Sequence, residues 1–397
     1  INDRQNIICF SDEAHRTQLE HSKKIQFSKD ADENMKAMVS KPYAKVLKEA
    51  FPHATFVGFT GTPIAETYQT FGEEIDRYTM DQAVADGLTV PIKYHPRIAK
   101  VLLDQEKDKQ IEDNYKKCAD DGATSDDIQK SKKAMSSMEV ILGEPSRLER
   151  LATDIHDHYI SACNNDPDRV QKAMVVCSNR SIAYKLLTIF REKYPEWFEE
   201  KKSPDDSLLS EEELRKLPLM PTIAMVATRG ANDAKDMYDY LGEKSRVKKL
   251  DDAFKMEHSN FRIVIVVDMW ITGFDVPSLT YLYNDKPLQK QLLIQTISRV
   301  NRKYPGKEYG YIIDYIGIHE NMKQAMHQFG GETFGPSDDD VQQAYESLII
   351  ELEILKSLFV GFDITPFTNP DTKPLERLEC LSSAADYIIT LNQKLNV

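Results

Sequence analysis

The stretch FRIVIVVDMWITGFDVPSLTYLYNDKPLQKQLLIQTISRVNR, residues 261–302, decides the fold predicted for this chain. Its β-branched run Ile263–Val267 predicts a strand buried on both faces of a parallel sheet. The loop Thr272–Pro277, TGFDVP, follows that strand, and ligands of open α/β sheets bind beside the carboxyl ends of the strands. A second strand is expected over Leu279–Tyr283 and a helix over Lys290–Arg302. The stretch therefore predicts part of an α/β domain with a binding loop.

The expected helix carries a group of polar side chains. Gln295, Arg299 and Arg302 are four and three residues apart, so they would share one helix face. Two guanidinium groups and an amide favour a site that binds phosphate groups. The alternative is a solvated face, or a salt bridge to an acid such as Asp314. The order strand, TGFD loop, strand and Gln-x-x-x-Arg-x-x-Arg resembles motifs V and VI of superfamily 2 helicases and translocases, which favours the phosphate site.

A second motif lies near the start of the chain. The expected buried strand Ile7–Phe10 is followed by SDEAHRTQ, residues 11–18. At the carboxyl end of a strand, Asp12 can hold the water shell of Mg²⁺, and Glu13 can polarise a water for in-line attack on a γ-phosphate. The pattern predicts a Walker B site of DEAH type. An acidic helix start stabilised by the helix dipole is the alternative, and the preceding strand argues against it.

Between these motifs, Leu19–Met38 is polar without a clear apolar face, whereas Tyr43–Phe51 has the pattern of a helix. A strand is expected over Thr55–Phe59, and it ends in Thr60-Gly61-Thr62-Pro63. This turn resembles motif III, which senses the nucleotide in helicases of the superfamily. Its position after DEAH strengthens the helicase interpretation.

Strands and helices alternate from residue 147 to residue 318, which predicts a parallel sheet. We expect an α/β fold with tandem RecA-like parallel-sheet lobes, the first truncated, followed by a helical C-terminal region. The C-terminal part of the first lobe would span residues 1–78, a connector with a charged helical insertion over 102–138 would span 79–146, the second lobe 147–318, and the start of a helical domain 319–397.

The expected elements of these regions are taken from apolar periodicity and turn residues. Strands are expected over Lys172–Cys177, Thr222–Ala227 and Gly310–Asp314. Helices are expected over Met80–Leu88, Arg147–Cys163, Ser181–Tyr194, Asp233–Leu241, Val341–Phe359 and Leu378–Leu395. An exposed acidic loop is expected over Glu196–Pro218.

Composition limits the classes of function. No apolar run of the 397 residues approaches a membrane span, and five dispersed cysteines without a Cys-x-x-Cys pair suggest neither a disulfide framework nor a zinc site. A reducing cytoplasm is expected. A net charge of −13 disfavours a protein that coats nucleic acid nonspecifically, although it allows a local DNA track.

Together, SDEAHRTQ, GFTGTP, DGLTVP and residues 261–302 resemble the motor (R) subunits of type I restriction endonucleases. The resemblance spans about residues 6–317, and its most specific part is KPL followed by LIQTISRVNR, within residues 280–302. It implies ATP-dependent translocation of double-stranded DNA by a subunit that joins methylation and specificity subunits. In the full-length protein, translocation would be coupled to DNA cleavage by a separate nuclease domain.

The resemblance also implies roles for individual residues. Asp12 would coordinate Mg²⁺ and Glu13 would orient the hydrolytic water. Arg299 and Arg302 would be arginine fingers that neutralise charge on the transferred phosphoryl group. The remaining assignments are nucleotide binding by Asp275 and Gln295, coupling by His15, Thr60 and Thr62, and contact with the DNA backbone by Thr272 and Gly273.

Two motifs of the family are missing from the 397 residues. They contain no Gly-x-x-x-x-Gly-Lys-Ser/Thr P-loop, so this segment by itself is expected to be inactive. Pro167-Asp168 and Glu199-Glu200-Lys201 have the letters of a nuclease core, but they flank the expected strand and helix of another motif and are interpreted as coincidence. Two alternatives stay open: another superfamily 2 translocase, in repair or remodelling, and a fragment that binds DNA or partners without catalysis.

Overall fold

A computed structural model describes residues 4–14, 25–29, 35–39, 43–63, 67–68, 71–97, 138–167, 169–204, 209–288, 290–318, 322, 362–363, 365–368 and 372–395. The chain divides into two compact units, Ile1–Phe334 and Gly335–Val397. The expected charged insertion, apart from Met138, and the helix expected over Val341–Phe359 lie outside the described residues.

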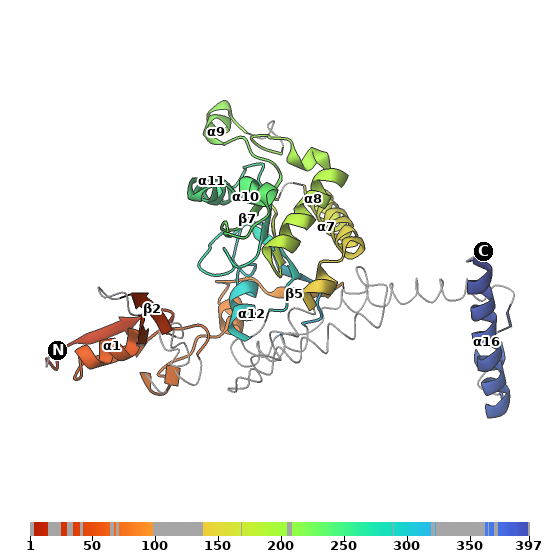
Figure 1. Ribbon diagram of the computed structural model, residues 1–397, viewed down its shortest axis with the longest axis horizontal. Helices are drawn as coiled ribbons and strands as arrows, with labels where there is room; N and C mark the ends of the chain where they lie inside the picture. Colours follow the sequence, from red (N-terminus) through yellow and green to blue (C-terminus); the bar gives the residue numbers. More distant parts are fainter. Residues whose placement is uncertain are drawn as a thin grey trace. The chain divides into compact units, whose positions relative to one another are not determined.

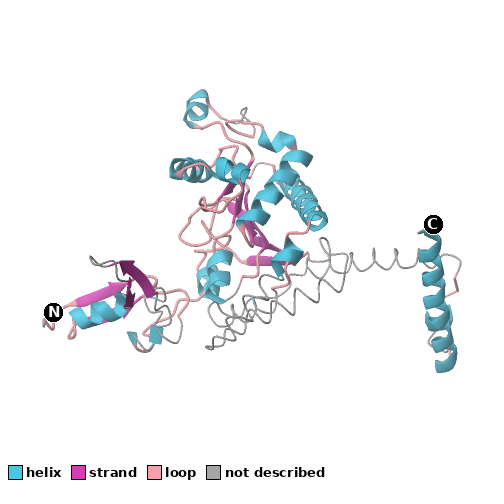
Figure 2. Ribbon diagram, viewed as in Figure 1, coloured by secondary structure: helices cyan, strands magenta, loops and turns pink. Residues whose placement is uncertain are grey.

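A six-stranded parallel sheet forms the centre of the first unit, and Figure 2 shows its strands in magenta. The strand order is β5-β10-β9-β6-β8-β7, and every neighbouring pair is parallel. The bounds are β5 Ile92–Pro96, β6 Lys172–Cys177, β7 Ile223–Val226, β8 Ile263–Val266, β9 Leu279–Asp285 and β10 Gly310–Asp314. The predicted α/β class and parallel sheet are confirmed.

Helices cover the sheet on both faces, as right-handed crossovers require. Two of them, α7 and α8, pack together on one side, and α10 and α11 lie on the other (Figure 1). The helix bounds are α7 Pro145–Asn165, α8 Arg180–Lys193, α10 Lys235–Leu241, α11 Lys244–Lys255 and α12 Lys290–Ile297. Strands β6 to β9 are buried along their whole length, which explains the largely apolar sequences of β6, β7 and β8, whereas β9 also buries Thr280, Asn284 and Asp285.

Two elements of this unit were missed by the sequence analysis. Edge strand β5 lies in the expected connector and pairs with β10, and α11 was not predicted. Both elements bury few side chains: α11 buries only Leu250, Ala253 and Phe254, and β5 buries only Tyr94. Apolar periodicity is therefore weak in both.

The acidic segment expected to be an exposed loop contains two short helices and a buried side chain. It contains the 3-10 helix η2, Pro195–Phe198, and helix α9, Glu211–Lys216. Trp197 is buried, which corrects the prediction, because its ring stacks on Phe190 at a centroid distance of 5.6 Å. The apolar surface of one ring thus outweighs the acidic composition around it.

The residues that precede the connector form smaller sheets. Strand β1, Ile8–Ser11, pairs in parallel with β4, Thr55–Gly58, and helix α1 spans Tyr43–Ala50. A hairpin of β2, Ile25–Lys29, and β3, Met35–Val39, lies where the sequence analysis found only a polar stretch. The missed signal is alternation with a period of two, as in Ile25-Gln26-Phe27-Ser28.

The prediction that the first strand is buried was wrong for its two large side chains. Ile8 is 60% exposed and Phe10 is 69% exposed. Ile8 and Phe10 alternate with Cys9 and Ser11, so they lie on the same face of the two-stranded sheet, and the described residues leave that face open.

The second unit contains α15, Thr365–Thr368, and α16, Pro374–Leu395, and the latter confirms the helix expected over Leu378–Leu395. In the first unit, the connector helix α3 spans Met80–Ala85. No helix among the described residues is long and apolar enough to cross a membrane.

Candidate functional site

The acidic motif forms a tight turn at the carboxyl end of β1. The amide of Phe59 donates to the carbonyl of Ser11 at 2.8 Å, and the amide of Ala14 donates to the carbonyl of Phe59 at 3.0 Å. Within the turn, Glu13 has a positive φ of 47°, and its amide donates to Asp12 Oδ1 at 2.8 Å. The turn buries Ala14 and leaves the carboxylate of Asp12 exposed. His15 lies outside the described residues.

This turn suits a magnesium ion that keeps most of its water. Mg²⁺ is usually bound through one or two carboxylates together with water and substrate phosphates. Asp12 presents such a carboxylate to solvent, and Glu13 is half-buried beside it. No group of three or more metal-ligating side chains occurs in the described part of the chain, and a site of this kind does not need one.

The Thr-Gly-Thr-Pro turn follows β4, the strand next to the acidic motif. The Oγ1 of Thr60 accepts a hydrogen bond from the amide of Thr62 at 3.1 Å. Thr62 is buried and Thr60 is half-buried. Because β1 and β4 are parallel neighbours, both turns lie at the same end of one sheet.

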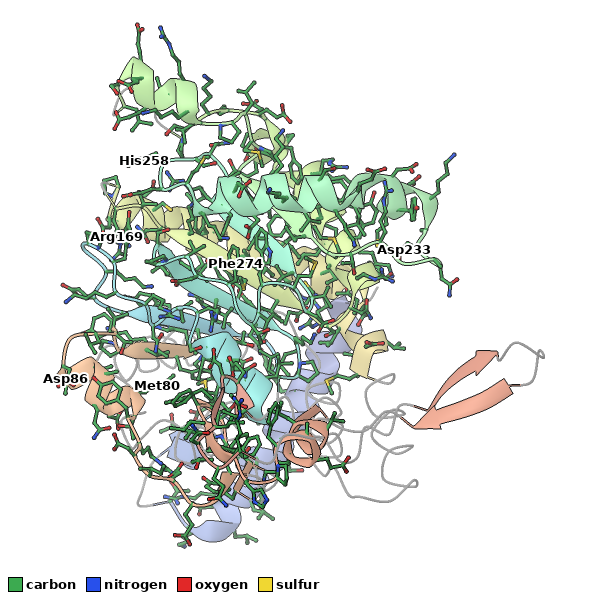
Figure 3. The ribbon with its side chains drawn as sticks, turned by 90° about the vertical axis from the view of Figure 1, so that its left-hand side faces the viewer. Met80, Asp86, Arg169, Asp233, His258 and Phe274 are labelled. Carbon is green, nitrogen blue, oxygen red and sulfur yellow. The ribbon has the colours of Figure 1, made fainter. Side chains whose placement is uncertain are left out.

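The TGFD loop connects β8 to β9 and is held from below by aromatic side chains. Trp270 has a positive φ of 66°, and its ring stacks on Phe274 with centroids 4.2 Å apart and planes 4° apart. Figure 3 labels Phe274 beneath α11, where Lys255 Nζ lies 5.3 Å from the centre of its ring. Buried aromatics thus anchor a loop whose Gly273 and Asp275 are exposed.

The helix that carries the arginines is shorter than predicted. It ends at Ile297, and 3-10-type hydrogen bonds join the amide of Arg299 to Thr296 and the amide of Val300 to Ile297, both at 3.1 Å. The hydroxyl of Ser298 donates to the carbonyl of Gln295 at 2.9 Å and helps to close the helix. The prediction that Gln295, Arg299 and Arg302 share one helix face was therefore wrong.

Both arginines nevertheless contact the TGFD loop. Arg299 donates through Nη1 to the carbonyl of Phe274 at 2.6 Å and through Nε to the carbonyl of Gln295 at 3.1 Å. Arg302 Nε lies 3.5 Å from Asp275 Oδ1, and the two side chains are 45% and 64% exposed. The loop and the segment after α12 thus form one polar surface at the carboxyl end of β8.

The charge of Arg299 is affected by its surroundings. Burial lowers the pKa of Arg299, and the neighbouring Arg302 lowers it further, whereas the carboxylates of Asp275 and Glu13 act to raise it. A guanidinium stays protonated under such shifts, because its ordinary pKa is far above neutrality. The site therefore holds two cations with acidic groups close by.

The acid that lies beside Arg302 is Asp275, and neither Arg299 nor Arg302 pairs with Asp314 in the described part of the chain. Asp314 is buried at the end of β10, where it accepts from the hydroxyl of Tyr94 at 2.5 Å and from Asn284 Nδ2 at 3.1 Å. Its carboxylate also accepts from the amides of Ile316, Gly317 and Ile318. It closes the turn after the strand and is not available to Arg302.

Three buried cations near the strand ends were given no role from the sequence: Arg147, Lys172 and Lys307. Arg147 is fully buried and pairs with Asp285 at 2.5 Å, where burial raises the pKa of Asp285 and Arg147 lowers it. Lys307 donates to the carbonyls of Pro277 at 3.1 Å and Leu279 at 2.6 Å, and burial lowers its pKa to about 7. A signal exists only for Arg147, which lies on the apolar stripe of α7.

Comparison with protein families gives two matches along the chain. Residues 1–128 match the SWI2/SNF2 ATPase family, and residues 178–317 match domain 3 of type I restriction enzyme subunit R. The two matches lie on either side of α7 and together contain the acidic motif, the TGFD loop and both arginines.

Curated relatives match nearly the whole chain. The HindI type I restriction enzyme endonuclease subunit of Haemophilus influenzae is 32% identical over 99% of this chain and 35% of its own length. A Methanocaldococcus jannaschii protein, provisionally named the MjaIXP type I endonuclease subunit, is 30% identical over 95% of this chain and 32% of its own. The chain thus spans about a third of the length of these relatives.

Among solved structures, a fragment provisionally assigned as an HsdR subunit of a type I restriction enzyme from Vibrio vulnificus matches with a TM-score of 0.43 and 19% identity. The match covers 73% of this chain and 44% of that one.

Proposed function

We propose that this chain, which belongs to the endonuclease (R) subunits of type I restriction enzymes, is part of an ATP-driven motor that translocates double-stranded DNA. The observation that carries the proposal is the contact of Arg299 and Arg302 with the TGFD loop at the carboxyl end of β8. Cations at that edge of a parallel sheet suit a phosphate-bearing ligand. In the intact enzyme the motor would work with methylation and specificity subunits and drive DNA cleavage.

ATP would supply the transferable phosphoryl group, and Mg²⁺ would neutralise charge on its oxygens. Asp12 would hold the ion through its exposed carboxylate, and Glu13 would orient the attacking water. Arg299 and Arg302 would stabilise the charge that develops during transfer. The carboxylate of Glu13 acts on the pKa of Arg299, which supports a site to which both contribute.

The remaining predicted site residues would bind the nucleotide, contact the DNA or couple the two. Asp275 and Gln295 would contribute to nucleotide binding; Asp275 pairs with Arg302, and the carbonyl of Gln295 accepts from Arg299. Coupling between nucleotide and DNA is assigned to His15, Thr60 and Thr62, and contact with the DNA backbone to Thr272 and Gly273. The exposure of Gly273 on the loop supports such a contact.

The test is DNA-stimulated ATP hydrolysis and DNA translocation by the full-length subunit assembled with its partners. Glu13→Gln keeps the size of the side chain and removes its charge, so we expect both activities to be lost while ATP still binds. The matched control is Glu200→Gln, because Glu200 is exposed and lies outside the acidic motif, the TGFD loop and the arginine segment. Parent-level ATP hydrolysis by Glu13→Gln would contradict the proposal. If the parent complex hydrolyses ATP without translocating DNA, the proposed function is reduced to that of an ATPase.

A further inference from the structure

We propose that the connector segment Gly87–Val90 is a strap that positions Arg302, and that Lys303 is the positioning residue which holds the strap in place. The inference rests on the proposed function, because it assumes that the reach of Arg302 matters for hydrolysis. It concerns part of DGLTVP together with Lys303, to which no catalytic or binding role is given above, and their role is to fix the backbone of Arg302.

The strap contacts the arginine segment at three successive positions. Thr89 and Arg302 form an antiparallel β-bridge, and the amide of Val90 donates to the carbonyl of Asn301 at 2.8 Å. Lys303 Nζ donates to the carbonyl of Gly87 at 2.9 Å. The strap thus contacts Arg302 and both of its neighbours in sequence, Asn301 and Lys303.

Both ends of the strap are fixed. On one side α3 begins with a capping box between Thr79 and Gln82, and its Ala83 carbonyl accepts from the amides of Leu88 and Thr89. On the other side the carbonyl of Pro91 accepts from Gly310, and the chain enters the sheet as β5. Figure 3 labels Met80 at the start of α3 and Asp86 directly after its end, and Figure 1 shows α12 beside this part of the chain.

The side chain of Arg302 has no comparable anchor in its ion pair. Its contact with Asp275 is long, 3.5 Å, and both groups are substantially exposed, so the pair contributes little to holding the guanidinium. Helix α12 has already ended at Ile297 and does not extend to Arg302. The β-bridge to the strap therefore fixes the backbone position from which the Arg302 side chain extends.

Position matters for a charge that acts in a transition state, because a misplacement of about 1 Å can cost on the order of 10² in rate. The connector is also the covalent link between the residues of β1 and β4 and the six-stranded sheet. A displacement of the N-terminal residues would pull on the same segment that fixes Arg302. The strap can thus transmit the arrangement of one part of the motor to the other.

Lys303 offers a test that leaves the fold in place. Its side chain is exposed, so Lys303→Met removes one contact with the strap without opening a cavity. Lys303→Arg keeps a donor and is the conservative variant. Gly87→Ala is an independent second variant, since Gly87 has a φ of 67° that an L side chain strains, while the space around it is open apart from Lys303 Nζ at 3.8 Å. Lys249→Met, on the exposed face of α11, is the matched control.

The experiment uses the full-length subunit in its complex and measures single-turnover ATP hydrolysis, nucleotide affinity and hydrogen exchange at the Val90 amide. We expect Lys303→Met and Gly87→Ala to slow hydrolysis roughly tenfold, to change affinity less than about threefold and to speed exchange at Val90. Lys303→Arg should stay near the parent. In an Arg302→Ala background, Lys303→Met should add no further loss, because the charge to be positioned is gone.

Two outcomes overturn the inference in distinguishable ways. If Arg302→Ala is slow while Lys303→Met and Gly87→Ala hydrolyse at the parent rate, the strap does not position Arg302 and the proposed function stands. If Arg302→Ala itself keeps the parent rate, the finger assignment fails and the strap has no charge to position. A loss in Lys303→Met that persists fully in the Arg302→Ala background would also contradict the inference.

Discussion

Arg299 Nη1 donates to the carbonyl oxygen of Phe274 at 2.6 Å, and this contact joins the end of α12 to the loop after β8. The ring of Phe274 stacks on that of Trp270, so the TGFD loop and the two arginines that contact it both rest on this buried aromatic pair. The arrangement makes the geometry of the site depend on a buried stack as well as on the charged residues above it.

The first prediction concerns the strained backbone of Trp270. Trp270→Gly and Trp270→Ala both remove the stack, but only alanine keeps a Cβ at a φ of 66°. Left-handed backbone costs an L-residue about 1–2 kcal/mol, whereas alanine is ordinarily favoured over glycine by about 0.4–1 kcal/mol. We expect the glycine variant to be the more stable of the two by up to about 1 kcal/mol. Urea unfolding of the chain measures this, and the opposite order would show that the strain is absent.

The second prediction concerns the buried pair of Arg147 and Asp285. Arg147→Met leaves the carboxylate of Asp285 buried without its cation, which should destabilise the chain by about 3–5 kcal/mol. The double variant Arg147→Met with Asp285→Leu should recover most of that loss, since no charge is then left unpaired. Equilibrium unfolding of both variants is the measurement. Equal instability of the single and double variants would mean that packing, rather than charge, decides the effect.

The third prediction is a pH dependence set by Lys307. Its pKa is about 7 in the folded chain against the ordinary 10.5, so between these values the unfolded chain binds more protons. Stability should therefore rise with pH from about 7 to 10.5, and the penalty for burying the charge should be complete below pH 7. Lys307→Met lacks this titration. Its advantage in unfolding temperature over the parent should shrink from pH 7 to pH 10, and an unchanged difference would contradict the assignment.

The fourth prediction concerns the 397-residue chain by itself. It contains no P-loop, so the principal donors to the β- and γ-phosphates are missing and Asp12 alone should not hold Mg·ATP tightly. We expect no DNA-stimulated phosphate release above background from the purified chain. Release that disappears with Glu13→Gln would show the expectation to be wrong.

The centre of the fold could be predicted because its strands carry their own signal. Lys172–Cys177 and Ile263–Val266 are apolar runs buried on both faces, and the structure confirms both. Edge strand β5 buries only Tyr94 and carries the polar Lys93 and His95 on either side of it, so the sequence predicted only a connection there. The pairing with β10 that makes it a strand is a long-range contact that no local pattern encodes.

The site was predictable in order but not in geometry. The sequence places Arg299 and Arg302 after the TGFD loop, and the structure brings both to that loop. A shared helix face was wrong because Ser298 closes the helix and Thr89 bridges to Arg302. The hydrogen bond of Ser298 reflects a local side-chain preference that competes with helix propensity, whereas the bridge from Thr89 to Arg302 is a tertiary contact.

The central claim is that Arg299 and Arg302 act on the charge of the transition state. Such a charge matters mainly during phosphoryl transfer, so its removal should lower the rate far more than the affinity for nucleotide. Lysine should substitute poorly, because it lacks the planar fork that engages two phosphate oxygens at once.

The most direct test is single-turnover ATP hydrolysis by Arg299→Ala and Arg302→Ala in the full-length, DNA-bound complex, with nucleotide affinity measured separately. We predict rates lower by about 10³–10⁵ with affinity changed only a few-fold, as for arginine fingers in related enzymes. Hydrolysis within a few-fold of the parent in both variants would contradict the account and would leave the two arginines as structural supports of the TGFD loop.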